Sequence, residues 1–202
     1  MMHTEIEAKF LDIRPDLLRE LIKKNGGLLV HPERLMRRKN FDYDDSRLEK
    51  IGGWIRLRDE GDVVTLAYKQ LVDRTIEGTK EISVVVGDFD TASELLLAVG
   101  LRLKSYQETK RERWELGGIE VTIDTWPWIP TFVELEGSDE KSLQTVAAKL
   151  QLDWSCALHG SVESAYQEYY DVTEEEIDGW QNITFIPVPQ RLAEKKRNRA
   201  GI

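Results

Sequence analysis

Cysteine and long apolar runs are scarce in this sequence, and an excess of positive over negative charge is lacking; each of these features excludes a class of protein. Because Cys156 is the single cysteine, the chain cannot form an internal disulfide, which fits a reducing compartment. No stretch approaches the ~20 apolar residues of a membrane span, and Glu5 and Glu7 interrupt any N-terminal secretion signal. The formal net charge of -9 disfavours a nucleic-acid surface. We therefore expect a cytoplasmic protein that binds neither nucleic acid nor membrane.

Several common catalytic motifs are absent as well. The sequence contains no Walker A loop, no GxGxxG turn and no HExxH helix, so none of these three chemistries is indicated. Cys156 and His159 have the spacing of a metal-binding pair, but no second pair is present, and we do not expect a zinc site. Catalysis, if present, must therefore rest on other side chains.

What the sequence has in abundance is charge that alternates with apolar residues. As a strand, the stretch EIEAKF at 5–10 would place Glu5, Glu7 and Lys9 on one face and three apolar side chains on the other. The apolar content of 41% is enough for a hydrophobic core. Eight strands are expected, most of them with this alternation, at residues 3–11, 28–43, 54–59, 63–71, 75–86, 103–116, 119–125 and 131–137.

Helical segments separate groups of these strands. Pro15 suits the first turn of the first helix, where its missing N–H is not needed. Asp90 and Ser138 are the expected N-caps of the second and third helices. Beyond Leu152 the pattern weakens, and only short helices at 161–170 and 173–177 are indicated.

The charges on the strands are sorted by sign. Cations gather on some strands and carboxylates on others: Arg56, Arg58, Lys69, Arg111 and Arg113 against Glu5, Glu7, Asp124, Glu134 and Glu136. Paired arginines repel each other unless an anion lies between them, and the guanidinium group suits phosphate oxygens. Paired carboxylates likewise need a hard cation such as Mg²⁺. The spacing alone leaves two alternatives: a solvated sheet face, or a closed barrel that holds polyphosphate and divalent metal.

A family resemblance favours the barrel. The stretch EIEAK at 5–9 matches the ExExK signature of the CYTH, or triphosphate tunnel metalloenzyme, superfamily. The charged residues that follow are in a similar order: Arg56-Leu57-Arg58, Lys69, Glu81, Arg111, Asp124 and Glu134-Leu135-Glu136. The resemblance covers about residues 1–150. It implies an α+β fold, an eight-stranded antiparallel β-barrel tunnel with flanking helices, and chemistry on triphosphates with Mg²⁺ or Mn²⁺.

The resemblance also implies roles for individual residues. The implied metal ligands are Glu5, Glu7, Glu134 and Glu136, with Glu81 and Asp124 in support. The implied catalytic phosphate ligands are Lys9, Arg56, Arg58, Lys69 and Arg111, and the further substrate-binding residues are Arg38, Trp54 and Arg113, the last at the tunnel mouth. Two features depart from the family pattern. Thr109 stands where many members have a lysine, and the C-terminal lysine that closes some tunnels cannot be placed.

Tryptophans are the only guide to the organic part of a substrate. Trp54 precedes Arg56 by two residues on the same face, which resembles the Trp-x-Arg-x-Arg arrangement of thiamine triphosphatases. Its ring either stacks on an organic group or packs at the barrel rim. Trp126 and Trp128 either cover the tunnel or pack on the barrel exterior.

These features predict a metal-dependent triphosphatase for thiamine triphosphate, inorganic triphosphate or a nucleoside triphosphate. One alternative is a class IV-type adenylate cyclase that makes cyclic AMP and pyrophosphate from ATP. Another is a non-catalytic polyphosphate-binding module. We expect a tunnel domain over 1–180, and a flexible C-terminal extension over 181–202 with the basic residues Lys195, Lys196, Arg197 and Arg199. The protein is expected to be a monomer or homodimer.

Overall fold

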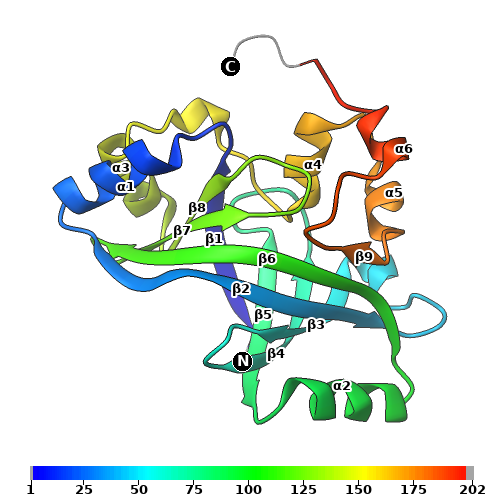
Figure 1. The fold of residues 1–202 in the computed structure, drawn as a ribbon. Coiled ribbons are helices and arrows are strands. Elements are labelled where there is room, and N and C mark those ends of the chain that lie inside the picture. Colours follow the sequence, from blue (N-terminus) through cyan, green and yellow to red (C-terminus); the bar gives the residue numbers. More distant parts are fainter. Residues whose placement is uncertain (1, 199–202) are drawn as a thin grey trace.

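The computed structural model describes residues 2–198 and arranges them around one antiparallel β-barrel (Figure 1). Eight strands follow one another in the order β2-β3-β4-β5-β1-β8-β7-β6, and the pairing of β6 with β2 closes the barrel. The strands are β1 (His3–Phe10), β2 (Leu28–Asp42), β3 (Gly53–Asp59), β4 (Val64–Leu71), β5 (Thr79–Val86), β6 (Arg102–Leu116), β7 (Ile119–Thr125) and β8 (Phe132–Gly137). The expected eight-stranded barrel is confirmed.

The apolar faces of β1, β2, β3, β7 and β8 point away from the barrel axis and pack against helices. Helices α1 (Pro15–Lys24) and α3 (Glu140–Lys149) lie together on one side (Figure 1) and cover β1, β7 and β8. Helix α2 (Phe89–Ala98) covers Phe41 and Leu57 of β2 and β3. Because successive side chains alternate across a strand, the charged residues between these apolar ones face the barrel interior. The hydrophobic core therefore lies around the barrel, and the interior is polar.

The C-terminal part of the chain covers a further side of the barrel. It consists of α4 (Glu163–Tyr169), α5 (Glu174–Asp178), the short strand β9 (Asn182–Ile183) and α6 (Gln190–Ala193). Strand β9 runs parallel to β6, and the buried Ile183 packs in a cluster with Trp126 and Tyr166. These contacts place much of 181–198 against the barrel, and the expected flexibility of the extension stays a prediction. Arg199 lies outside the described residues.

Several element boundaries differ from those expected. Helix α2 begins earlier because Asp88, not Asp90, accepts the hydrogen bond from the Thr91 N–H at 2.7 Å. Asp139, not Ser138, caps α3 by accepting from the Ser142 N–H at 2.9 Å. Strand β2 is continuous through Pro32, where the proline could have divided the expected strand in two, and it has register shifts against β6. Short 3-10 helices form at Glu49–Ile51 and Trp154–Cys156. Within residues 2–198, no helix has the length and apolarity needed to cross a membrane.

Candidate active site

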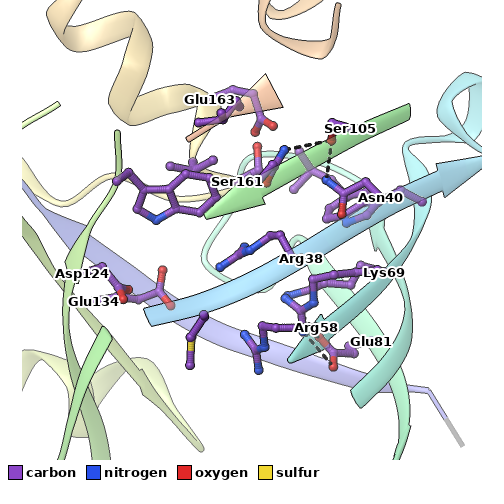
Figure 2. Close-up of a pocket in the computed structure, with 18 of the residues that line it drawn as sticks. Arg38, Asn40, Arg58, Lys69, Glu81, Ser105, Asp124, Glu134, Ser161 and Glu163 are labelled. Atoms are coloured by element: carbon purple, nitrogen blue, oxygen red, sulfur yellow. Dashed lines mark hydrogen bonds and ion pairs between the residues drawn. The ribbon is translucent and has the colours of Figure 1, made fainter. Parts of the chain in front are cut away.

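The barrel encloses a cavity of about 620 Å³ to which all eight barrel strands contribute side chains. Every residue to which the sequence analysis gave a metal-binding or substrate-binding role lines this cavity: Glu5, Glu7, Lys9, Arg38, Trp54, Arg56, Arg58, Lys69, Glu81, Arg111, Arg113, Asp124, Glu134 and Glu136. Figure 2 shows some of these side chains directed from several strands toward a common space. The strand alternation therefore brings the predicted residues together, while their individual roles stay predictions.

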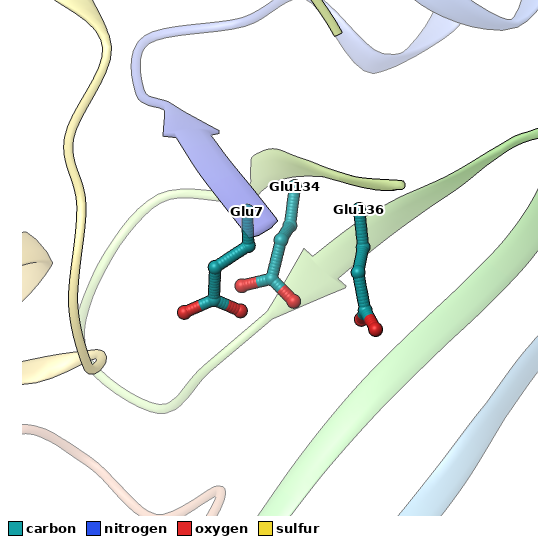
Figure 3. Close-up of side chains that lie close together, drawn as sticks. All are labelled: Glu7, Glu134 and Glu136. Atoms are coloured by element: carbon teal, nitrogen blue, oxygen red, sulfur yellow. The ribbon is translucent and has the colours of Figure 1, made fainter. Parts of the chain in front are cut away.

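Three carboxylates converge on one side of the cavity. One oxygen of each of Glu7, Glu134 and Glu136 lies within 4.8 Å of the other two (Figure 3). Their strands are neighbours, since Glu7 of β1 pairs with Glu136 of β8 in the antiparallel register. Burial, followed by the nearby carboxylates of Glu134 and Glu5, raises the pKa of Glu136 to about 7. The three side chains thus form an acidic cluster that Lys9 neutralises in part, through its contacts with Glu7 and Glu134.

The other three expected metal ligands lie against cations. Lys69 Nζ is 2.7 Å from Glu5 Oε2 and 3.1 Å from Glu81 Oε2. Arg111 donates to both oxygens of Asp124, at 2.7 and 2.6 Å, because these residues are direct neighbours across β6 and β7. Burial alone would raise the pKa of Glu81, but Arg56 and Lys69 lower it to about 2. These three carboxylates therefore hold the cationic side chains of the cavity in place.

Arginine side chains line the wall beside the carboxylates. Burial, and then the like charges of Arg58, Arg56 and Arg111, lower the pKa of the Arg38 guanidinium well below its ordinary value. Burial and Arg56 likewise lower the pKa of Arg58 to about 10. The Nε atoms of Arg38, Arg56 and Arg58 are enclosed and have no hydrogen-bond partner among the described residues. Such a set of unpaired cationic donors fits an anion with several oxygens.

Lys9 connects the carboxylates to the C-terminal part of the chain. Its buried Nζ donates to Glu7 Oε1 at 2.9 Å and to the Gly160 carbonyl at 2.6 Å, and lies 3.0 Å from Glu134 Oε2. Burial lowers the pKa of Lys9, but Glu134 and Glu7 outweigh that effect and raise it above its ordinary value. A charged Lys9 therefore holds β1, β8 and the loop before α4 together.

The aromatic residues occupy three different positions. Trp54 is half-buried and lines the cavity. Trp126 is also part of the wall, with the Arg38 guanidinium 4.5 Å from its ring centroid, so it neither covers the tunnel nor packs only outside. Trp128 packs against Trp180 at a centroid distance of 5.8 Å and is not part of the cavity lining.

The rim carries a charged pair. Arg113 Nη2 lies 2.6 Å from Glu120 Oε2, and 42% of the Arg113 side chain is exposed, as expected for a residue at the mouth. Inside the cavity, Arg38 Nη2 donates to Thr109 Oγ1 at 3.2 Å. The position that holds lysine in many family members is thus occupied by a hydrogen-bond acceptor.

Some cavity residues have no counterpart in the sequence predictions. Glu60 pairs with Arg58 at 2.5 Å, although the sequence around it indicated only a hairpin turn. Ser161 and Glu163 reach the cavity from the loop and helix beyond Leu152, where the sequence indicated only a short helix and no site residue. Neither Lys195 nor Lys196 lines the cavity, so neither takes the place of a tunnel-closing lysine.

The sequence matches the CYTH domain over residues 3–170. The chain belongs to the CYTH family. This family consists of metal-dependent enzymes that act as triphosphatases or cyclases, and the expected membership is confirmed. No protein among the curated sequences matches the chain.

Solved CYTH-like structures share the fold. A candidate adenylate cyclase from Vibrio parahaemolyticus aligns with a TM-score of 0.69 and 16% identity, covering 82% of this chain and 98% of that one. A candidate adenylyl cyclase from Hippeastrum with a dominant triphosphatase activity aligns at 0.57 and 13% identity, covering 83% and 96%. A conserved hypothetical protein from Pyrococcus furiosus aligns at 0.63 and 20% identity, covering 76% and 94%. At these identities, the similarity establishes the barrel fold alone.

Proposed function

We propose that this CYTH protein is a metal-dependent triphosphatase that hydrolyses a small triphosphate inside the barrel. One observation carries the proposal: three converging carboxylates and a wall of arginines with unpaired donors line the same cavity. A solvated sheet face would not enclose these Nε donors without partners, because a buried polar group that lacks a hydrogen bond is costly. A ligand that brings both phosphate oxygens and a cation would satisfy both groups.

The carboxylate site fits a hard divalent cation, and we propose Mg²⁺ or Mn²⁺. The ligands would be Glu7, Glu134 and Glu136, because carboxylate oxygens are the donors these ions prefer. Among the described residues, Glu136 has no ion pair with lysine or arginine, and its raised pKa reflects its burial first and then the neighbouring carboxylates. When bound, such an ion neutralises charge on phosphoryl oxygens.

The side chains of the chain itself would bind and orient the triphosphate. Arg38, Arg56 and Arg58 can donate through their unpaired Nε atoms to phosphate oxygens. Arg111 is fixed by its two hydrogen bonds to Asp124, so its side chain is already in place when the substrate binds. Donors that are already positioned stabilise the negative charge of phosphoryl transfer without a reorganisation cost.

Two other functions use the same cavity. In an adenylate cyclase, the ribose 3′ hydroxyl would attack the α-phosphorus of ATP and pyrophosphate would leave; the similar Vibrio parahaemolyticus structure is described as a candidate enzyme of this kind. The Hippeastrum relative, with its dominant triphosphatase activity, is the precedent for hydrolysis on this fold. A polyphosphate-binding module would hold the same ligand without turnover.

One assay panel separates these functions. The purified protein is incubated with Mg²⁺ or Mn²⁺ and with inorganic triphosphate, thiamine triphosphate or ATP, and orthophosphate, pyrophosphate and cyclic AMP are measured. We expect orthophosphate release that requires the metal. Equimolar cyclic AMP and pyrophosphate from ATP would overturn the hydrolase assignment. Tight binding without any product would favour the binding module.

A further inference from the structure

Glu163 reaches the cavity from the start of α4, outside the barrel strands that supply the arginines and the acidic cluster. Its Oε2 is enclosed and has no hydrogen-bond partner among the described residues. Figure 2 shows the Glu163 carboxyl group directed into the same pocket that Arg38 enters from β2. A buried polar group without a partner is costly, and a ligand in the cavity would supply the partner.

The backbone on both sides of Glu163 is held against the barrel. Before it, the Lys9 Nζ donates to the Gly160 carbonyl at 2.6 Å, and the Lys9 backbone exchanges two hydrogen bonds of 2.9 Å with the same segment. After it, Tyr166 is fully buried, and its hydroxyl donates to the Pro127 carbonyl at 2.8 Å. Glu163 therefore has a fixed position relative to the barrel strands.

The surroundings of Glu163 favour its protonated form. Three charged groups act on it from the elements around it: Lys9 of β1, Arg74 of the loop between β4 and β5, and Asp178 of α5. Both cations already have partners, because Lys9 contacts two carboxylates at 2.9 and 3.0 Å and Arg74 pairs with Glu174. Burial, together with Asp178, raises the pKa of Glu163 to about 7, against the effects of its own backbone N–H, Lys9 and Arg74.

A protonated carboxyl group differs from a carboxylate in what it can bind. Its O–H is a donor, and a hydrogen bond from such a group to an anionic oxygen is short and strong. The oxygens of an ionised triphosphate are acceptors, so they suit this donor as they suit the unpaired Nε atoms of the arginines. A carboxylate in the same position would repel the phosphates.

We propose that Glu163 binds the substrate through a protonated carboxyl group, which donates a hydrogen bond to a phosphate oxygen. The inference rests on the proposed function and adds to its phosphate-binding residues one that lies outside the barrel strands. The proton stays on Glu163, and no bond of the substrate is made or broken by it. Above neutral pH, the free protein must take up a proton before this hydrogen bond forms, so the affinity for phosphate falls.

The test measures the binding of inorganic triphosphate to the metal-free protein by calorimetry at pH 6 and pH 8.5. The amide of Glu163→Gln does not titrate, so this variant keeps an N–H donor at both pH values. We expect similar dissociation constants for wild type and variant at pH 6, and about tenfold or more weaker binding by wild type than by the variant at pH 8.5. Glu136 and the triphosphate also titrate in this range, but with both proteins, so their effects cancel in the ratio.

Glu163→Leu separates the effect of the donor from the effect of the charge. It lacks the donor, so at pH 6 it should bind triphosphate about tenfold more weakly than wild type. It also lacks the negative charge that Glu163 carries at pH 8.5, where it should bind no more weakly than wild type. Glu175→Gln is the matched control, because it removes an exposed carboxylate of α5 that does not line the cavity, and it should behave as wild type at both pH values.

Proton uptake gives a second readout that a merely structural role would not change. Calorimetry at pH 8 in two buffers of different ionisation enthalpy counts the protons that the protein takes up with the ligand. Wild type should take up a fraction of a proton more than Glu163→Gln. Equal uptake by the two proteins would overturn the inference. So would a ratio of their dissociation constants that does not change with pH.

The proposed hydrolysis is measured separately, as orthophosphate release with Mg²⁺ or Mn²⁺. A pH-dependent difference in binding between wild type and Glu163→Gln, without any hydrolysis, would support the inference and overturn the proposed function. Hydrolysis, together with a binding ratio that does not change with pH, would overturn the inference alone. If Glu163→Leu does not fold, Glu163→Gln and the proton uptake decide.

Discussion

Individual charges inside the barrel are balanced only in part by one another. Lys9, Lys69 and Arg111 each contact a carboxylate at 3.0 Å or less. Arg38 contacts a hydroxyl and an indole ring, and it has no ion pair with a described carboxylate. Its guanidinium also faces the like charges of neighbouring arginines. Replacing the Arg38 charge should therefore have opposite effects on the stability of the free protein and on its affinity for the ligand.

We predict that Arg38→Met stabilises the free protein and weakens binding of inorganic triphosphate. Methionine keeps the apolar stem and removes a buried like charge, so the free energy of unfolding should rise by about 1–3 kcal/mol. The dissociation constant, measured by calorimetry, should rise about tenfold or more because a charged hydrogen bond to phosphate is lost. Arg37→Met is the control, since Arg37 faces outward and pairs with Asp59 at 2.5 Å. A less stable variant with unchanged binding would contradict the prediction.

The metal assignment predicts that Glu136→Gln loses turnover. Glutamine has the same shape but lacks the charge that a divalent cation needs, so metal-dependent kcat/KM should fall at least about 100-fold. Glu140→Gln, on the exposed surface of α3, should keep the wild-type rate. Unchanged turnover in Glu136→Gln would show that another set of residues holds the metal.

Glu163 should make the stability of the protein depend on pH. Burial raises its pKa from 4.5 to about 7, against the opposing effect of its backbone hydrogen bond; Asp178 adds to the rise, while Lys9 and Arg74 oppose it. The folded state thus binds the proton more tightly than the unfolded state. The resulting stabilisation is complete below the unfolded pKa and is lost as pH rises toward 7.

The measurement compares Glu163→Gln with wild type by urea unfolding at pH 4.5 and pH 7. Glutamine does not titrate, so the unfolding free energy of the variant relative to wild type should increase by about 1–3 kcal/mol between the two pH values. Other titrating groups affect both proteins equally and cancel in the difference. A difference that stays constant with pH would show that Glu163 does not retain its proton in the folded state.

At the scale of single elements, the starts of α2 and α3 are each capped by one aspartate side chain. Asp139 accepts from the Ser142 N–H and hydroxyl, at 2.9 and 2.6 Å. We predict that Asp139→Ala lowers the free energy of unfolding by about 1 kcal/mol, the usual cost of losing an N-cap. Ser138→Ala, one residue earlier, should change it by less than half as much. Equal losses from the two variants in urea unfolding would contradict this assignment of the cap.

The strands could be predicted from sequence because charge alternates with apolar residues along them. Stretches such as EIEAKF have only one register that buries the apolar face. The pattern therefore predicts both that the stretch is a strand and which of its faces is buried. Helix boundaries were less certain, since Asp88 and Asp90 are both good caps and tertiary packing selects between them. Strand β9 has only two residues and pairs with β6 in parallel, so no local pattern could indicate it.

The membership of the candidate site was predictable, but the pairing of its charges was not. Whether Asp124 contacts a metal or Arg111 depends on the register between β6 and β7, which sequence spacing does not determine. Glu163 belongs to a helix of seven residues beyond the periodic part of the sequence, and only the fold brings it over the cavity. The pairing of Asp124 and the position of Glu163 therefore depend on contacts between residues that are distant in the sequence.

At the scale of the whole molecule, the net charge is -9, while several arginines and lysines are gathered inside the barrel. We predict that inorganic triphosphate stabilises the protein even without metal, because it binds the folded state alone. At a ligand concentration of 100 times the dissociation constant, the gain is about 2.7 kcal/mol. Thermal unfolding with triphosphate, and with orthophosphate at equal ionic strength, measures the effect. Equal shifts for both anions would mean that the cavity does not distinguish a chain of phosphates.

The order of strands around the barrel also constrains how the chain reaches its fold. Strand β1 lies between β5 and β8, so its two neighbours are residues 79–86 and 132–137. During synthesis, the N-terminal strand leaves the ribosome first, yet its second partner emerges more than a hundred residues later. Contacts so distant in sequence form slowly, because a long loop must close before they are made. Among the barrel strands, β1 with the family signature is therefore made before the others, and it gains its second partner only when β8, the last of the eight in the sequence, has been synthesised.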